Sequence, residues 1–106
     1  MTAFRVFFNG EPICTAGIGP DGVLSAAVTW VKRANEEGHF RFHVGGLDDR
    51  TNEHARWKVP QPKLGDEVSI VIVETDEIDP AQERYKRVNK WTWQYRDGHI
   101  PPGDVH

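Results

Sequence analysis

The feature that most constrains the fold of this chain is a run of β-branched residues, VSIVIV, at positions 68–73. Successive side chains of a strand point to opposite faces, so this run would be apolar on both faces. Such strands are usually covered on both sides, and we therefore predict that this one is central in its sheet. We expect a core in which it is buried with three aromatic residues, the full set being Val68, Ile70, Ile72, Phe42, Trp30 and Trp57.

Shorter segments of alternating apolar and polar residues recur along the rest of the chain. They lie at 4–8, 13–16, 40–44, 54–59 and 90–96, between turns rich in glycine, proline and asparagine. Asn9-Gly10 is a strong signal for a two-residue hairpin, because both residues tolerate positive φ. Pro12 cannot donate to a ladder, which favours an edge position for the returning strand.

The segment 23–33 fits two patterns. Leu24, Ala27, Val28 and Val31 would form a helical stripe, whereas alternate residues from Leu24 to Trp30 would form one face of a strand. The β-prone run 28–31 and the lack of a capping box before it favour a long strand.

The last quarter of the chain is predicted to contain a short helix over 79–88. Asp79 would be its N-cap, Pro80 its first residue, and Gln82 the partner that completes a capping box. An aromatic strand over 90–96 would follow, and residues 99–106 would form a loose tail. We therefore predict one domain, 1–98, of the all-β class. Its expected architecture is an antiparallel sandwich or barrel of about six to seven strands with one short late helix.

Composition excludes some classes of function. The 106 residues carry a net charge of −3, so nothing attracts the chain generally to nucleic acid or to an anionic membrane, and a nucleic-acid partner is not expected. No apolar segment approaches the length needed to cross a membrane. With one cysteine and no signal-peptide pattern at the N-terminus, we expect a cytoplasmic protein.

Several short motifs together resemble a group of small uncharacterised bacterial proteins. The motifs lie within residues 4–79 and are Gly22-Val23-Leu24-Ser25-Ala26, Trp30-Val31, His43-Val44-Gly45-Gly46-Leu47-Asp48, His54 with Trp57, and Gly65-Asp66-Glu67-Val68. The resemblance implies a compact domain. It carries over no catalytic or binding residue.

The residues usually associated with catalysis or metal binding have ordinary explanations here. Cys14 on a strand is expected to be a small buried hydrophobe, not a nucleophile. His39 and His43 are four residues apart, which on a strand separates them by about 13 Å, too far to share one zinc ion. The acidic turn 48–54 lacks the order of a calcium loop. We therefore predict no catalytic residue, no metal site and no cofactor.

A cationic face is the first of two unusual features. Arg41 and His43 would share the outer face of one strand, and His54, Arg56 and Lys58 that of the next. If the two strands pair, these side chains gather on one surface and would suit an anionic ligand. The alternative is that acidic loops of the same chain neutralise them.

The second unusual feature is charge segregation towards the C-terminus. Residues 66–83 contain seven acidic residues and no lysine or arginine, whereas residues 84–96 contain five basic residues and no acidic one. Trp91, Trp93 and Tyr95 would line one face of the strand at 90–96. This aromatic stripe could pack on its own domain, or it could join two copies in a homodimer.

These observations favour a non-enzymatic binding or protein-interaction module. Its expected contact residues are Arg41, His43, His54, Arg56, Lys58, Trp91, Trp93 and Tyr95. Two alternatives stay open. One is a small β-barrel enzyme that uses His43 or His54 as acid or base, and the other is a binder of single-stranded nucleic acid through residues 84–96.

Overall fold

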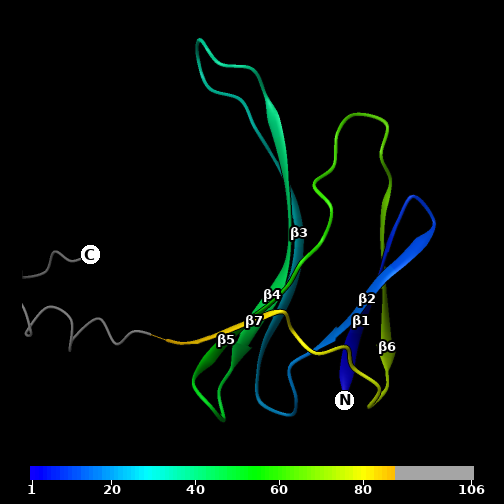
Figure 1. Ribbon diagram of the computed structural model, residues 1–106, viewed down its shortest axis with the longest axis vertical. Helices are drawn as coiled ribbons and strands as arrows, with labels where there is room; N and C mark the ends of the chain where they lie inside the picture. Colours follow the sequence, from blue (N-terminus) through cyan, green and yellow to red (C-terminus); the bar gives the residue numbers. More distant parts are fainter. Residues whose placement is uncertain (88–106) are drawn as a thin grey trace, which may run out of the picture.

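The computed structural model describes residues 1–87, which form seven strands in two antiparallel sheets (Figure 1). The strands are β1 (Thr2–Phe8), β2 (Glu11–Gly17), β3 (Gly22–Val31), β4 (His39–Asp48), β5 (Glu53–Trp57), β6 (Val68–Glu74) and β7 (Glu83–Lys86). A three-stranded sheet has the order β2-β1-β6, and a four-stranded sheet has the order β3-β4-β5-β7. The all-β prediction is confirmed.

The first hairpin forms where the sequence predicts it. Asn9 and Gly10 have φ angles of 51° and 83°, the pair of positive values that a type I′ turn requires. The turn also contacts the residue before β6, because the Asn9 amide donates a hydrogen bond to the Glu67 carbonyl at 2.8 Å. Within the described residues β2 pairs only with β1, so Pro12 lies on an edge strand as expected.

The strand β6 is not where the sequence predicts it. Among residues 1–87 its single neighbour is β1, so β1 is the central strand of this sheet and β6 is at the edge. Ile70 and Ile72 are 39% and 71% exposed, and Val71 is 46% exposed. The expectation of a central, doubly covered strand is therefore wrong for this part of the chain. A run of β-branched residues indicates a strand, but the place of that strand in its sheet depends on pairing with strands that are far away in the sequence.

The ambiguous segment 23–33 is a strand, not a helix. It pairs with β4 in an unbroken register from Gly22↔Asp48 to Val31↔His39. The resulting hairpin is long, and its tip extends beyond the rest of the molecule at the top of Figure 1. Trp30 lies near that tip and is 61% exposed, so it is not a core residue.

The predicted helix over 79–88 is also wrong, since the described part of the chain contains no helix and β7 stands there instead. The groups that would have capped the helix have other partners. The Asp79 carboxylate accepts the Thr15 amide at 2.8 Å, and the Gln82 side chain accepts the Lys58 amide at 2.9 Å. Because both side chains bind residues far away in the sequence, the chain continues as β7, which pairs with β5.

The core lies between the two sheets. Its buried members are Val6, Cys14, Ala16, Ile18, Phe42, Val44, Ala55 and Trp57, so both sheets contribute to one cluster. Trp57 is 2% exposed, and its indole Nε1–H donates to the Asp79 carbonyl at 2.8 Å. Phe42 and Trp57 thus meet the expectation of burial, and Val68 packs against the cluster from β6.

An ion cluster lies where β4 ends. Asp48 is 3% exposed and contacts both Arg50 and Arg84 at 3.3 Å. Burial of the Asp48 carboxyl raises its pKa, but hydrogen bonds from the Arg50 backbone and side chain, with the charges of both arginines, outweigh this and hold the pKa below its ordinary value. The buried acid is therefore ionised and paired.

Within residues 1–87 no helix exists that is long and apolar enough to cross a membrane. The predicted aromatic strand at 90–96 and the predicted tail at 99–106 lie outside the described residues.

Candidate ligand face on the four-stranded sheet

The outer face of the four-stranded sheet is defined by alternation along β4 and β5. Phe42 and Val44 of β4 point into the core, as do Ala55 and Trp57 of β5. Successive side chains of a strand alternate, so the intervening residues point outward. These are Arg41 and His43 on β4, and His54 and Arg56 on β5, four of the residues that the sequence predicts as contacts.

The register brings these side chains into adjacent rows across the sheet. His54 is opposite Leu47 on one side and Tyr85 on the other. Arg56 is likewise flanked by Gly45 and by a carboxylate, Glu83. The predicted cationic face is therefore assembled by pairing of β4 with β5, and β7 adds two further side chains to it.

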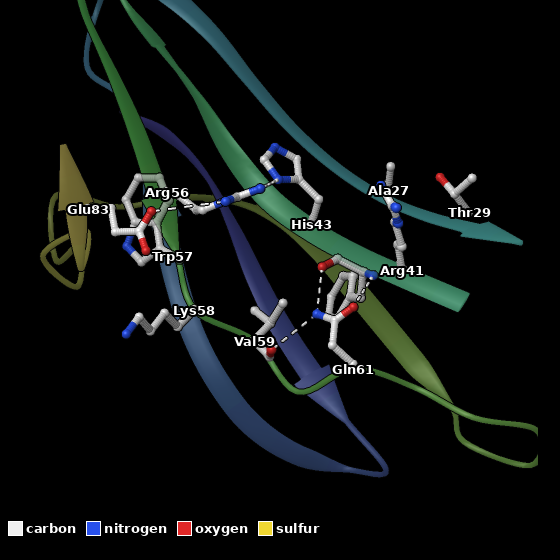
Figure 2. Close-up of a pocket in the computed structure, with 11 residues that line it drawn as sticks. Ala27, Thr29, Arg41, His43, Arg56, Trp57, Lys58, Val59, Gln61 and Glu83 are labelled. Carbon is white, nitrogen blue, oxygen red and sulfur yellow. Dashed lines mark hydrogen bonds and ion pairs between the residues drawn. The ribbon is translucent and has the colours of Figure 1, made fainter. Parts of the chain in front are cut away.

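A cationic hollow of about 630 Å³ opens at one end of this face (Figure 2). Three cations and one carboxylate line it, together with apolar and neutral residues; the full set is Ala27, Thr29, Arg41, Phe42, His43, Arg56, Trp57, Lys58, Val59, Gln61 and Glu83. Arg56 extends between Glu83 and His43. Its guanidinium is 4.0 Å from the Glu83 carboxylate, and both side chains are about half exposed, so this ion pair neutralises the hollow only weakly.

Arg41 and Lys58 complete the charge of the cationic hollow. Both are exposed, and among residues 1–87 neither has a carboxylate oxygen within 4.0 Å. Within residues 1–87, the one carboxylate that pairs with this face is that of Glu83 at Arg56, and it belongs to strand β7 and not to an acidic loop. Among the described residues, two cations therefore remain available to an incoming anion.

His43 joins the cationic hollow to its neighbour. Its Nδ1 lies 3.5 Å from Nη2 of Arg56, a contact in which the guanidinium donates to a neutral imidazole. Burial lowers the pKa of His43, and the positive charge of Arg56 lowers it further. The negative charge of an anion bound here would oppose the effect of Arg56, so its binding would favour the protonated imidazole.

An apolar hollow of about 330 Å³ lies on the other side of His43 and Arg56. Its lining is Val23, Ser25, His43, Gly46, Leu47, His54, Ala55, Arg56 and Tyr85. The rings of His54 and Tyr85 stack with centroids 5.2 Å apart and planes 25° apart, and Tyr85 is 54% exposed. The two hollows share His43 and Arg56, so a ligand could occupy both at once.

Gly45 lies on this face between Ser25 and Arg56. A Cβ built at Gly45 would lie 2.6 Å from the Ala55 carbonyl and 3.1 Å from the His43 ring. Any side chain there would therefore press against both the neighbouring strand and the imidazole. The glycine is a requirement of the packing at this point.

The other candidate groups offer no reactive site. Cys14 is buried at 7% exposure, and burial, with a smaller contribution from the charge of Asp79, raises the pKa of its thiol to about 11. Such a thiol is protonated at neutral pH and is a poor nucleophile. In the part of the chain that the structure describes, no three histidine, cysteine or acidic side chains are grouped so that they could hold a metal ion.

The structure brings together Arg41, His43, His54, Arg56 and Lys58, whereas Trp91, Trp93 and Tyr95 lie outside the described residues. Sequence reasoning missed Gln61, whose amide donates to the Phe42 carbonyl and accepts its N–H, both at 3.0 Å (Figure 2). It also missed Glu83 and Tyr85 as members of this face. No local pattern in residues 83–86 marks them, because the strand reads ERYK and all four residues are exposed.

Comparison with known proteins yields no relative, since no family model, no curated protein and no solved structure matches the chain.

Proposed function

We propose that this protein is a non-enzymatic interaction module that binds an acidic, partly apolar peptide segment on the outer face of the four-stranded sheet. The observation that carries the proposal is the junction of the cationic hollow with the apolar hollow at His43 and Arg56. A carboxylate would occupy the first hollow, and an adjacent apolar side chain the second. We interpret the two-sheet arrangement that presents this face as a sandwich.

Charge supports a peptide over a polyanion. The whole chain is acidic, with a net charge of −3, so it would repel a long nucleic acid outside the immediate contact. The cationic hollow itself carries three cations against one carboxylate. One or two acidic side chains are enough to complement Arg41 and Lys58.

The test is a titration of the ¹⁵N-labelled full chain with a short capped peptide of alternating glutamate and leucine, followed by NMR. We expect shifts of the His43, Gly45 and Arg56 amides, and weaker binding at higher salt. A lysine and leucine peptide of the same length is the matched control, and we expect no saturable shifts from it. Equal responses to both peptides would contradict the proposal.

Two variants locate the binding surface. Arg41→Gln and Lys58→Gln should each weaken the glutamate peptide roughly two- to fivefold, the range for exposed ion pairs. Lys32→Gln at the tip of the long hairpin removes the same charge away from both hollows, and it should leave affinity unchanged. Weakening by Lys32→Gln to the same extent would mean that only net charge matters.

A pH series adds an independent readout. The pKa of His43 in the free protein is lowered from its ordinary value of 6.5, and a bound anion would raise it. Affinity should therefore increase as the pH falls towards the lowered pKa of the free protein. His43→Gln should remove this increase while retaining binding. An unchanged pH profile in that variant would exclude His43 from the contact.

A further inference from the structure

The edge strand β6 is the second surface of this protein that invites a partner. Ile70, Val71 and Ile72 are all at least 39% exposed, and within residues 1–87 only β1 pairs with β6. The strand carries no charge, proline or bulge between Val68 and Val73. Natural proteins usually protect such edges, because an open apolar edge recruits another strand.

The hydrogen-bond register shows which residues of β6 face outward. Asn9 donates to the Glu67 carbonyl, and Thr75 donates to the Met1 carbonyl, at the two ends of the β1–β6 ladder. The odd-numbered residues therefore bond to β1, because bonding alternates along an antiparallel pair. Val68, Ile70 and Ile72 consequently direct their N–H and C=O groups away from β1.

These outward-bonding residues also face the core side of the sheet. Val68 packs against the core cluster, and Ile70 and Ile72 share its face of the strand. Their exposure means that the core side is uncovered along this edge. A strand added here would bond to these three residues and could also cover them with its own side chains.

Charge identifies the kind of strand that fits. Asp66 and Glu67 precede β6, Glu74 is its last residue and Asp76 follows, so β6 is acidic at both ends. Two β6 strands paired with each other would bring these carboxylates together, which opposes a β6–β6 contact. The suitable partner is a strand that is apolar on one face and basic at its ends.

The chain itself contains such a segment. Residues 90–96 read KWTWQYR, with lysine and arginine at the ends and aromatic residues at alternate positions. In antiparallel pairing with β6, Trp91 would lie opposite Ile72, Trp93 opposite Ile70, and Tyr95 opposite Val68. The same register places Arg96 opposite Glu67. The segment 90–96 therefore matches the edge of β6 in hydrogen-bonding positions, in its apolar face and in charge.

The other edge strands of the described chain fit this segment less well. The strand β2 contains Pro12 and a register irregularity in its pairing with β1. The strand β7 has only four residues, three of them charged. The strand β3 is followed directly by Lys32 and Arg33, which would repel the basic segment.

The position of β7 determines which copy supplies the segment. The described chain ends at residue 87, on the side of the four-stranded sheet that faces away from the three-stranded sheet (Figure 1). Four residues from Lys86 to Lys90 span at most about 14 Å. Returning to β6 would take this linker past the four-stranded sheet and then across the spacing of about 10 Å between packed sheets. The linker is too short for this path.

We infer that residues 90–96 of one copy add to the free edge of β6 in a second copy, and that reciprocal exchange produces a two-fold homodimer. Each interface joins an edge to a segment, so one dimer contains two equivalent contacts. The dimer is held by strand addition with aromatic cover and charge complementarity.

The test uses the full chain and two single variants. Ile72→Lys places a charge on the free edge, and Trp93→Ser removes the central aromatic residue of the segment. We expect a dimer for the unmodified protein in sedimentation, and at least a tenfold increase in its dissociation constant for each variant. Val23→Lys adds the same charge to another exposed apolar residue on an edge strand, β3, and should leave the dimer intact.

Mixing the two variants distinguishes this arrangement from its rivals. Ile72→Lys protein keeps an intact segment, and Trp93→Ser protein keeps an intact edge, so an equimolar mixture should form a heterodimer with one working interface. A β6–β6 dimer would not be restored in this way. In the unmodified dimer, the Ile70 and Ile72 amides should be protected from hydrogen exchange, and Trp93→Ser should remove that protection.

Three results would overturn the inference. The first is a full-length protein that remains monomeric at about 100 μM. The second is a dimer that Trp93→Ser leaves unchanged, and the third is a mixture of the two variants that stays monomeric. A monomer whose Ile70 and Ile72 amides are protected would show that the segment docks within its own chain, which also refutes the exchange.

Discussion

Replacing Trp57 by phenylalanine tests the arrangement of the core directly. Trp57 is 2% exposed and donates a 2.8 Å hydrogen bond to the Asp79 carbonyl. The hydrogen bond contributes about 1 kcal/mol. The smaller ring also buries two fewer carbon atoms, at about 0.8 kcal/mol each. We therefore expect Trp57→Phe to lower the free energy of unfolding by about 3 kcal/mol.

Trp30→Phe is the matched control, because Trp30 is 61% exposed near the end of β3. Its cost should stay within about 0.5 kcal/mol. Urea unfolding followed by far-ultraviolet circular dichroism measures both variants without relying on tryptophan fluorescence. With a slope of about 1.5 kcal/mol/M, Trp57→Phe should lower the midpoint by about 2 M. Equal midpoints for the two variants would refute the assignment of Trp57 to the core.

Three further predictions concern single residues. Cys14 should react slowly with a thiol reagent in the folded protein and rapidly in urea, because burial raises the pKa of its thiol to about 11; fast labelling of the native protein would contradict this. Gly45→Ala should destabilise the protein by about 1–3 kcal/mol in urea unfolding and weaken binding of the glutamate peptide, because its Cβ would lie 2.6 Å from the Ala55 carbonyl. A variant as stable as the parent would argue against this packing. Asp48→Asn should destabilise the protein above about pH 5, where the carboxylate of the parent is ionised and paired. The difference in free energy of unfolding from the parent should shrink as the pH falls below 3.8, because the folded carboxyl has a lowered pKa and its contribution is lost on protonation. A difference independent of pH would contradict the ionised pair.

Local patterns in the sequence predicted the features that local chemistry decides. Asn9-Gly10 forms its turn because both residues accept positive φ, a property independent of the rest of the chain. The alternation around Arg41 and His43 likewise placed them on the outer face, since a buried Phe42 forces its neighbours outward.

Long-range contacts decided the features that the sequence did not reveal. Asp79 has the sequence context of a helix cap, yet its carboxylate bonds to Thr15, 64 residues earlier. The apolar run in β6 indicated a strand correctly, but only the partners of β1 place it at an edge. Glu83 and Tyr85 reach the ligand face through pairing of β7 with β5, which no local pattern specifies.

The two proposed surfaces lie on different sheets, and this separation has a consequence for binding. Exchange at β6 would leave the Arg41 and Lys58 face open in both copies, so a dimer would present two peptide sites. A tandem peptide with two acidic segments on a suitable linker would then bind more tightly than a single segment, by roughly 10²–10⁴-fold when the geometry permits. Ile72→Lys should remove this gain while leaving affinity for the single peptide unchanged, because the residue lies outside both hollows. Isothermal titration of parent and variant with both peptides measures the difference. A loss of single-peptide affinity in Ile72→Lys would show that the two surfaces are coupled and would refute their independence.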